Sequence, residues 1–171
     1  MPFATAFVGL ALNPITAAGI PLALGMLSGS PTGNAVQSQW YKDLRTPPGR
    51  PPRQAFPIAW SLLYLSMGYA SHIAARALNE TISPSHHAQL EHGLNLYYVQ
   101  LALNLAWSPL FFGAKKIGLA LADSVLLTGT AWYMTALLHN PTNSQTTYFL
   151  APYCAWLSFA TYLNAGIWFM N

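Results

Sequence analysis

Charged residues are scarce in this sequence. Of its 171 residues, seven are Lys or Arg and four are Asp or Glu, which is 6% of the chain, whereas about 25% of an ordinary soluble domain is charged. So few charges cannot cover a water-exposed surface of this size, which excludes a soluble globular enzyme. Disorder is excluded too, because 53% of the residues are apolar and the net charge is only +3. The length suits one domain over residues 1–171.

Cysteine is nearly absent as well. Cys154 is the one cysteine, so an internal disulfide cannot form, and no Cys/His cluster has the spacing of a zinc site. His86, His87 and His92 are expected in a polar loop and do not make a metal motif. The sequence also lacks a nucleophile–base pair and a phosphate-binding loop. We therefore predict no catalytic residues, no metal and no cofactor.

The few charges leave four long uncharged stretches, at residues 1–41, 54–75, 92–114 and 124–171. A bilayer core of about 30 Å needs about 20 apolar residues in a helix, and turn-forming residues at 139–145 divide the last stretch. The pattern predicts an all-α integral membrane protein, a bundle of five transmembrane helices at about 4–28, 55–78, 94–113, 117–138 and 147–169. Pro14 and Pro21 are expected to kink the first helix.

The basic residues indicate an orientation. Five spans place six of them on one side of the membrane and Arg76 on the other. Because cytosolic loops are enriched in Lys and Arg, the richer side and the C-terminus are predicted to be cytosolic. The six are Lys42, Arg45, Arg50, Arg53, Lys115 and Lys116.

A proline-rich segment, residues 40–52, joins the first two predicted helices and is expected to be extended rather than helical. Two interpretations remain open. The segment is either a solvated connector held at lipid headgroups by its basic residues, or a lid over a cavity between the helices. In the second case Arg45, Arg50 or Arg53 would meet an anionic group of a ligand.

Two groups of residues share a helical face. Trp60, Tyr64 and Gly68 are spaced four apart, which suits either close helix packing or the binding of a flat ligand. Asn104 and Trp107 share a face with Gln100, and amides in hydrocarbon are costly unless they find partners. These amides either bind another helix or face a ligand.

Two ionisable residues inside predicted helices are candidates for a function. Asp123 is the one acid within a span and is by default a functional candidate with a partner. His72 could be a proton site, although a lone histidine in a helix is more often simply hydrogen-bonded.

Four segments together resemble the translocator protein family, that is, the tryptophan-rich sensory proteins or peripheral-type benzodiazepine receptors. The segments are WYKDLRTPPGRPP at 40–52, FPIAWSLLYLSMG at 56–68, QLALNLAWSPLFFG at 100–113 and PYCAWLSFATYLN at 152–164. An ALAD sequence at 120–123 lies between the last two. The resemblance runs from Trp40 to Trp168, about three quarters of the chain.

The resemblance implies a five-helix membrane bundle in which a proline-rich loop 1 covers a cytosol-side cavity. It implies binding of tetrapyrroles such as protoporphyrin IX and haem, of sterols, and of synthetic benzodiazepine-type ligands, in the mitochondrial outer membrane or the endoplasmic reticulum. Whether the protein forms a homodimer stays open. The implied cavity residues are Trp60, Tyr64, Asn104, Trp107, Trp156, Phe159, Ala160 and Leu163, with Arg45, Arg50 and Arg53 at the cavity mouth.

The sequence departs from the family pattern at four positions. The family's sterol motif falls at 163–169, where Ala165 and Phe169 replace the expected Tyr and the expected Arg or Lys. Gly49 and Leu119 stand where tryptophan is frequent. A porphyrin can stack on aromatic rings and pair its propionates with arginines, so we rank porphyrins above sterols as ligands.

Three functions are compatible with the sequence. The first is a membrane protein that binds and carries tetrapyrroles and lipids. The second is a light-dependent enzyme that degrades porphyrins with Trp60 and Trp156 as redox-active side chains. The third is a ligand-regulated, stress-sensing scaffold. We favour the first and expect no enzymatic activity.

Overall fold

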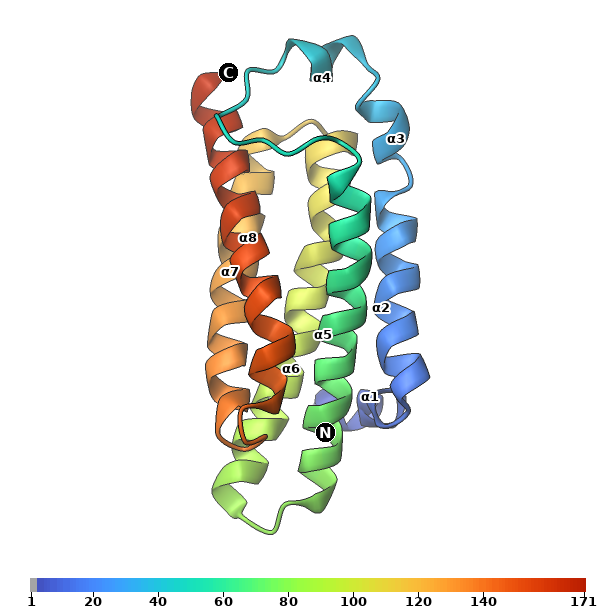
Figure 1. Ribbon diagram of the computed structural model, residues 1–171, viewed down its shortest axis with the longest axis vertical. Coiled ribbons are helices and arrows are strands. Elements are labelled where there is room, and N and C mark those ends of the chain that lie inside the picture. Colours follow the sequence, from blue (N-terminus) through green and yellow to red (C-terminus); the bar gives the residue numbers. More distant parts are fainter. Residues whose placement is uncertain (1–2) are drawn as a thin grey trace.

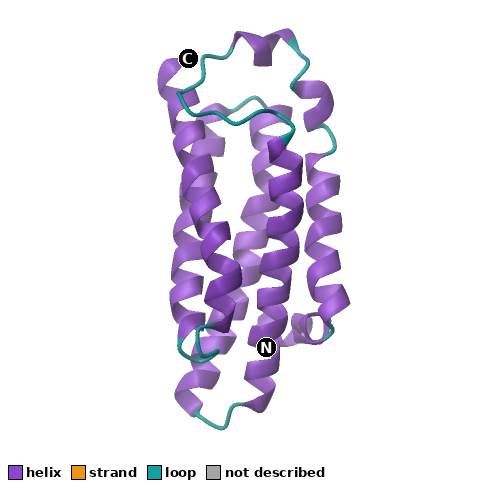
Figure 2. Ribbon diagram, viewed as in Figure 1, coloured by secondary structure: helices purple, strands orange, loops and turns teal. Residues whose placement is uncertain are grey.

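A computed structural model describes residues 3–171, and within this range the chain is helical and contains no strand (Figures 1 and 2). Five long helices lie side by side, each antiparallel to the next along the chain, as the sequence predicts. Shorter helices flank them. The elements are α1 (Phe3–Leu12), α2 (Pro14–Gly29), α3 (Thr32–Ala35), α4 (Gln39–Asp43), α5 (Ala55–Glu80), α6 (Pro84–Ser108), η1 (Pro109–Gly113), α7 (Ile117–His139) and α8 (Gln145–Met170).

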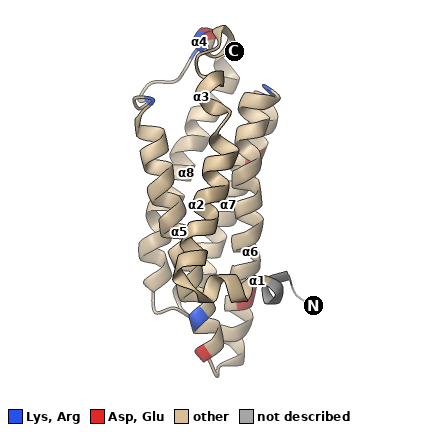
Figure 3. Ribbon diagram, turned by 90° about the vertical axis from the view of Figure 1, so that its right-hand side faces the viewer, with Lys and Arg blue, Asp and Glu red and all other residues tan. Residues whose placement is uncertain are grey.

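The first predicted helix is in fact two. The chain leaves the helix at Asn13, whose side-chain oxygen accepts a hydrogen bond from the backbone N–H of Ile15 at 2.9 Å, and Pro14 begins α2. An Asn cap followed by Pro is a strong helix start, so the prediction of one kinked helix over 4–28 is wrong. Figure 3 shows α1 lying across the bundle at the end far from the C-terminus. Pro21 lies inside α2 without ending it.

The third predicted helix begins ten residues earlier than expected. Ser83 caps α6 through a hydrogen bond to the backbone N–H of His86, and Pro84 is the first helical residue. Helix α6 therefore includes His86, His87 and His92. The expectation that these residues lie in a polar loop is wrong. At the other end of α6, Pro109 changes the helix to the π-helical turn η1, which ends at Gly113.

The connection between α2 and α5, residues 30–54, is called loop 1. Its residues 40–43 are helical in α4, because the Ser38 hydroxyl caps that helix at the backbone N–H of Tyr41. The expectation of a wholly extended segment over 40–52 therefore fails at its beginning. Beyond Asp43 the segment is not helical, but it makes a turn at Pro48 and Gly49. Figure 1 shows loop 1 lying over the end of the bundle that also carries the C-terminus. We call this the loop-1 end and the opposite one the far end.

The interior of the bundle is apolar around a few polar side chains. Met67 of α5, Leu94 of α6, Met134 of α7 and Leu157 of α8 are at most 1% exposed. A second buried cluster, around Phe111, Ala120 and Ile167, lies under loop 1. Long apolar side chains also face outward, among them Ile58, Leu62, Leu119, Leu126 and Phe169, each more than half exposed.

Within residues 3–171, α7 is the helix that is long and apolar enough, by itself, to cross a membrane. With 16 residues, α2 is shorter than such a span. Helices α6 and α8 carry amides that the fold turns inward, namely Gln100 and Asn104 on α6 and Asn164 on α8. Hydropathy sums all faces of a helix equally, so inward polar residues lower the sum without reaching lipid.

Most basic residues lie at the loop-1 end (Figure 3). Lys42 lies on α4, Arg50 and Arg53 follow it, and Lys115 precedes α7. At the far end, Arg76 lies on the last turns of α5. This is the asymmetry that the sequence predicts.

Candidate ligand-binding site

A chain of buried hydrogen bonds joins α5, α6 and α8 inside the bundle. The Tyr64 hydroxyl donates to Asn104 Oδ1 at 2.5 Å, and Asn104 Nδ2 donates to the Tyr153 hydroxyl at 2.9 Å. Tyr153 in turn donates to Gln100 Oε1 at 2.5 Å. Buried polar groups need such partners, and here each amide finds its partner on another helix. For Asn104 the structure thus favours interhelical pairing over a free, ligand-facing amide.

A second polar link lies closer to loop 1. Trp107 donates its indole N–H to Asn164 Oδ1 at 3.0 Å, and Asn164 Nδ2 donates to the backbone oxygen of Ile117 at 3.2 Å. Phe111 stacks on the Trp107 ring, with centroids 4.9 Å apart. Trp107 therefore lies inside the bundle, as the sequence predicts, with its polar atom already paired.

Aromatic residues of α5 and α8 form a half-buried wall beside these links. Phe56 meets Trp156 edge-on at 5.8 Å between centroids, and Trp156 lies 5.9 Å from Phe159. Trp60 lies 5.7 Å from Tyr64. Trp60 and Trp156 both pack against the main core and are partly buried. One side of this aromatic wall therefore contacts the core, and the other side is accessible.

The Trp156 indole nitrogen is the exception among the polar atoms here. It is buried and has no hydrogen-bond partner among the described residues. An unpaired buried donor costs about 1–3 kcal/mol, which a ligand acceptor would remove. Of the remaining predicted cavity residues, Ala160 is half-buried and Leu163 is buried, both on α8.

The predicted mouth residues lie on loop 1, and two of them share one aromatic ring. The Arg50 guanidinium donates to the Tyr41 hydroxyl and lies 5.0 Å from the ring centroid, while that of Arg53 lies 5.8 Å from the same centroid. Lys115 approaches the Trp40 ring at 5.4 Å. Arg45 is exposed. Such cation–π contacts hold positive charge at the rim.

Loop 1 is fastened to the last turns of α8. The Tyr162 hydroxyl donates to the backbone oxygen of Pro48 at 3.2 Å, and the buried Pro47 lies over Gly166. Within the broken sterol motif, 163–169, Gly166 is thereby covered by loop 1. Phe169, at its end, is 81% exposed.

Two departures from the family pattern have structural explanations. Leu119 is 59% exposed on the outside of α7, so its side chain lies away from the interior residues above. Gly49 has φ of 84°, a conformation that favours glycine over a bulky residue such as tryptophan.

Three other residues singled out in the sequence serve packing or lie apart. Gly68 faces the backbone of α2, where a Cβ would come within 2.7 Å of Ala18 Cα, so its notch is filled by the protein itself. The His72 ring nitrogen Nδ1 lies 2.9 Å from the backbone oxygen of Ala11. Asp123 is 8% exposed on α7, and its Oδ2 has no partner among the described residues.

The predicted site residues do not include Gln100 or the hydrogen-bond partners on α8, Tyr153 and Asn164. A usable signal existed, because Tyr153, Leu157 and Asn164 are spaced four and seven residues apart and lie on one helical face. Polar residues on a face that also carries leucine indicate an inward-facing polar row.

The chain is similar in sequence to a known protein family. A profile of the TspO/MBR family matches residues 17–169. The Translocator protein homolog of Schizosaccharomyces pombe is 40% identical over 172 aligned residues, which cover 96% of each chain. The Translocator protein of Homo sapiens is 36% identical over 90% of this chain and 89% of its own. The Tryptophan-rich protein TspO of Chlorobaculum tepidum is 34% identical over 90% of this chain and 92% of its own.

Proposed function

The chain belongs to the TspO/MBR family of multi-span membrane proteins, and from that premise we propose that it binds and carries tetrapyrroles, with sterols and other lipids as a second ligand class. The ligand would lie between α5, α6 and α8, under loop 1. It would contact the predicted residues Trp60, Tyr64, Asn104, Trp107, Trp156, Phe159, Ala160 and Leu163.

The observation that carries the proposal is the unpaired indole N–H of Trp156 within an aromatic wall. A porphyrin offers flat faces that stack on such rings, and it carries two propionates. Arg50 and Arg53 lie on loop 1 at the same end of the bundle, held over Tyr41, and a guanidinium can bind a carboxylate through two hydrogen bonds. A sterol would use the apolar surface and the Trp156 donor but neither arginine.

Binding of protoporphyrin IX to the purified protein in detergent, in the dark, tests this proposal. Quenching of tryptophan fluorescence should show one saturable site. Trp156→Phe, which keeps a stacking ring but removes the donor, should weaken binding by roughly three- to tenfold. The matched control is Trp132→Phe on α7, whose ring is half exposed on the outside of the bundle. Equal effects of the two variants would contradict the proposed site.

The arginines are tested with a second ligand. Arg50→Gln should weaken binding of protoporphyrin IX more than binding of its dimethyl ester, because the ester has no carboxylate to pair. If both ligands lose affinity equally, loop 1 does not contact the propionates.

We place binding and transport above catalysis, because the fungal and human relatives are named as translocator proteins. Irradiation of the porphyrin-loaded protein gives the decisive comparison. A porphyrin product formed at a rate that depends on Trp60 and Trp156 would replace this proposal with the degrading activity.

For the cellular setting we propose the mitochondrial outer membrane, with the endoplasmic reticulum as the alternative, and loop 1 and the C-terminus in the cytosol. The asymmetry of basic residues supports this orientation. Trypsin treatment of intact organelles tests it, because a cytosolic loop 1 would be cut after Arg45 and Arg53. A homodimer is also proposed, and cross-linking in native membranes would detect it.

A further inference from the structure

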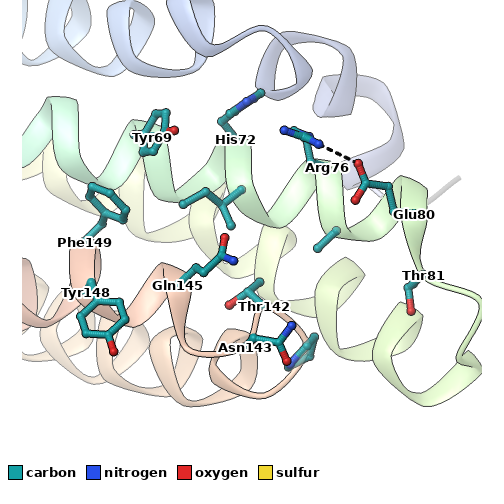
Figure 4. A pocket seen from close by; sticks show the side chains of 13 residues that line it. Tyr69, His72, Arg76, Glu80, Thr81, Thr142, Asn143, Gln145, Tyr148 and Phe149 are labelled. Atoms are coloured by element: carbon teal, nitrogen blue, oxygen red, sulfur yellow. Dashed lines mark hydrogen bonds and ion pairs between the residues drawn. The ribbon is translucent and has the colours of Figure 1, made fainter.

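The far end of the bundle contains a cavity that the proposed porphyrin site does not use. It has a volume of about 660 Å³, within the range of about 300–1,000 Å³ that is usual for small-ligand sites. It lies between the second half of α5 and the turn that joins α7 to α8. Figure 4 shows its lining side chains.

The cavity is polarised along its length. Tyr69, Tyr148 and Phe149 lie together at one end, and Arg76 and Glu80 lie at the other (Figure 4). Because α5 runs toward the far end and terminates at Glu80, the aromatic end is nearer the middle of the bundle. The charged end is at the bundle's outer limit. A phospholipid has the same polarity, with its headgroup outside and its glycerol and acyl chains inward.

The charged end carries one positive and one negative group. Arg76 Nη2 and Glu80 Oε1 are 3.0 Å apart, and their side chains are 61% and 66% exposed. An exposed pair of this kind contributes only about 0.2–1 kcal/mol, so a ligand that offers each group a new partner can open it. A guanidinium binds phosphate through two parallel hydrogen bonds, and the Glu80 carboxylate can pair with a headgroup ammonium.

Neutral donors are available across the cavity. Asn143 and Gln145 line it from the start of α8 and the turn before it, and their side-chain amides bind no other described residue. They can donate to phosphate or ester oxygens. Tyr148, 77% exposed, has the amphipathic ring that favours a membrane interface and a cationic headgroup.

We propose that this cavity is a binding site for a zwitterionic phospholipid, with the phosphate on Arg76, the ammonium on Glu80 and the glycerol backbone beside Tyr148. An anionic lipid fits less well, because its headgroup has no cation for Glu80 and would bring negative charge to that carboxylate. The site is separate from the porphyrin site, which lies at the other end of the bundle.

Native mass spectrometry of the delipidated full chain tests the proposal, in an equimolar mixture of phosphatidylcholine and phosphatidylglycerol with identical acyl chains. The wild-type protein should retain phosphatidylcholine at least about threefold better. Glu80→Gln should abolish or reverse this preference, since Arg76 is then unpaired. Arg76→Gln should reduce retention of both lipids.

The matched control is Glu91→Gln, which removes a carboxylate on the second turn of α6, outside the cavity. It should leave the lipid ratio unchanged. The proposal is overturned if Glu80→Gln keeps the wild-type ratio, or if Glu91→Gln changes it as much. Tyr148→Ala gives a variant that keeps both charges and should still lose phosphatidylcholine retention; unaltered retention there would also contradict the site.

Soluble glycerophosphocholine distinguishes a lipid from a free zwitterion. It carries the same headgroup without acyl chains, so it should displace the lipid only at a large excess. Displacement at equal concentration would show that a water-soluble molecule is the ligand and would overturn the assignment to phospholipid.

Discussion

The side-chain amide of Asn171 binds both backbone polar groups of Arg45. The backbone N–H of Arg45 donates to Asn171 Oδ1, and Asn171 Nδ2 donates to the Arg45 backbone oxygen, both at 2.9 Å. Both backbone polar groups of Arg45 are thus paired, as they would be by a neighbouring β-strand. Here the partner is a single side-chain amide at the end of α8. Together with Pro47 over Gly166, this pair fixes loop 1 on the bundle.

Loop 1 should loosen when this amide is removed. Asn171→Ala deletes both hydrogen bonds to Arg45, each contributing about 0.5–1.5 kcal/mol, so hydrogen exchange at residues 44–50 should accelerate by about tenfold. Asn79→Ala, an exposed asparagine near the end of α5, is the control. Unchanged exchange in Asn171→Ala would mean that Pro47 and Tyr162 hold the loop by themselves.

The buried polar chain should depend on Tyr153. Tyr153→Phe leaves Gln100 Oε1 and Asn104 Nδ2 without their partner and should cost about 1–3 kcal/mol, read as a lower thermal unfolding temperature in detergent. Tyr133→Phe removes the hydroxyl of a residue on α7 that is 54% exposed and should change little. Equal unfolding temperatures for the two variants would show that this series of buried hydrogen bonds is unimportant for stability.

Contact between α2 and α5 should depend on Gly68. In Gly68→Ala the new Cβ would meet the α2 backbone at Ala17 and Ala18, which cannot move as a side-chain tip can, so α2 must shift. We expect a loss of roughly 1–3 kcal/mol in unfolding experiments. Gly129→Ala has no atom within 4 Å and should instead gain up to about 1 kcal/mol from helix propensity.

Removing the charge of Asp123 should stabilise the protein. Its Oδ2 is buried without a partner, and an unpaired buried charge is costly, so Asp123→Asn should raise the unfolding temperature. Glu91→Gln serves as the comparison on the neighbouring helix. A lower unfolding temperature in Asp123→Asn would indicate that the carboxylate has a bound partner in the membrane.

The long uncharged stretches were enough to locate the five long helices, because a bilayer requires long apolar segments. The errors fall where local capping decides the structure. Asn13 and Pro14 divide the first stretch, and Ser83 with Pro84 starts α6 well before its apolar part, so that helix includes polar residues such as Glu91. Ser38 similarly starts α4 inside the proline-rich segment.

For the site, helical spacing correctly put Gln100, Asn104 and Trp107 on one inward face. It could not identify their partners, because the pairing of Asn104 with Tyr153, and of Trp107 with Asn164, depends on the rotation and height of α8 relative to α6. Spacing along one helix does not contain that information. The same holds for Gly68, whose neighbour on α2 is distant in the sequence.

The break at Asn13 also affects the membrane around the protein. With 16 residues, α2 is about 24 Å long at 1.5 Å per residue, which is shorter than an average hydrocarbon core of about 30 Å, while α5, α6 and α8 are longer. The bilayer beside α2 must therefore become thinner, or another surface must cover its end. Such hydrophobic mismatch on one side of the bundle would bias where the protein resides, toward membranes or membrane regions of smaller thickness.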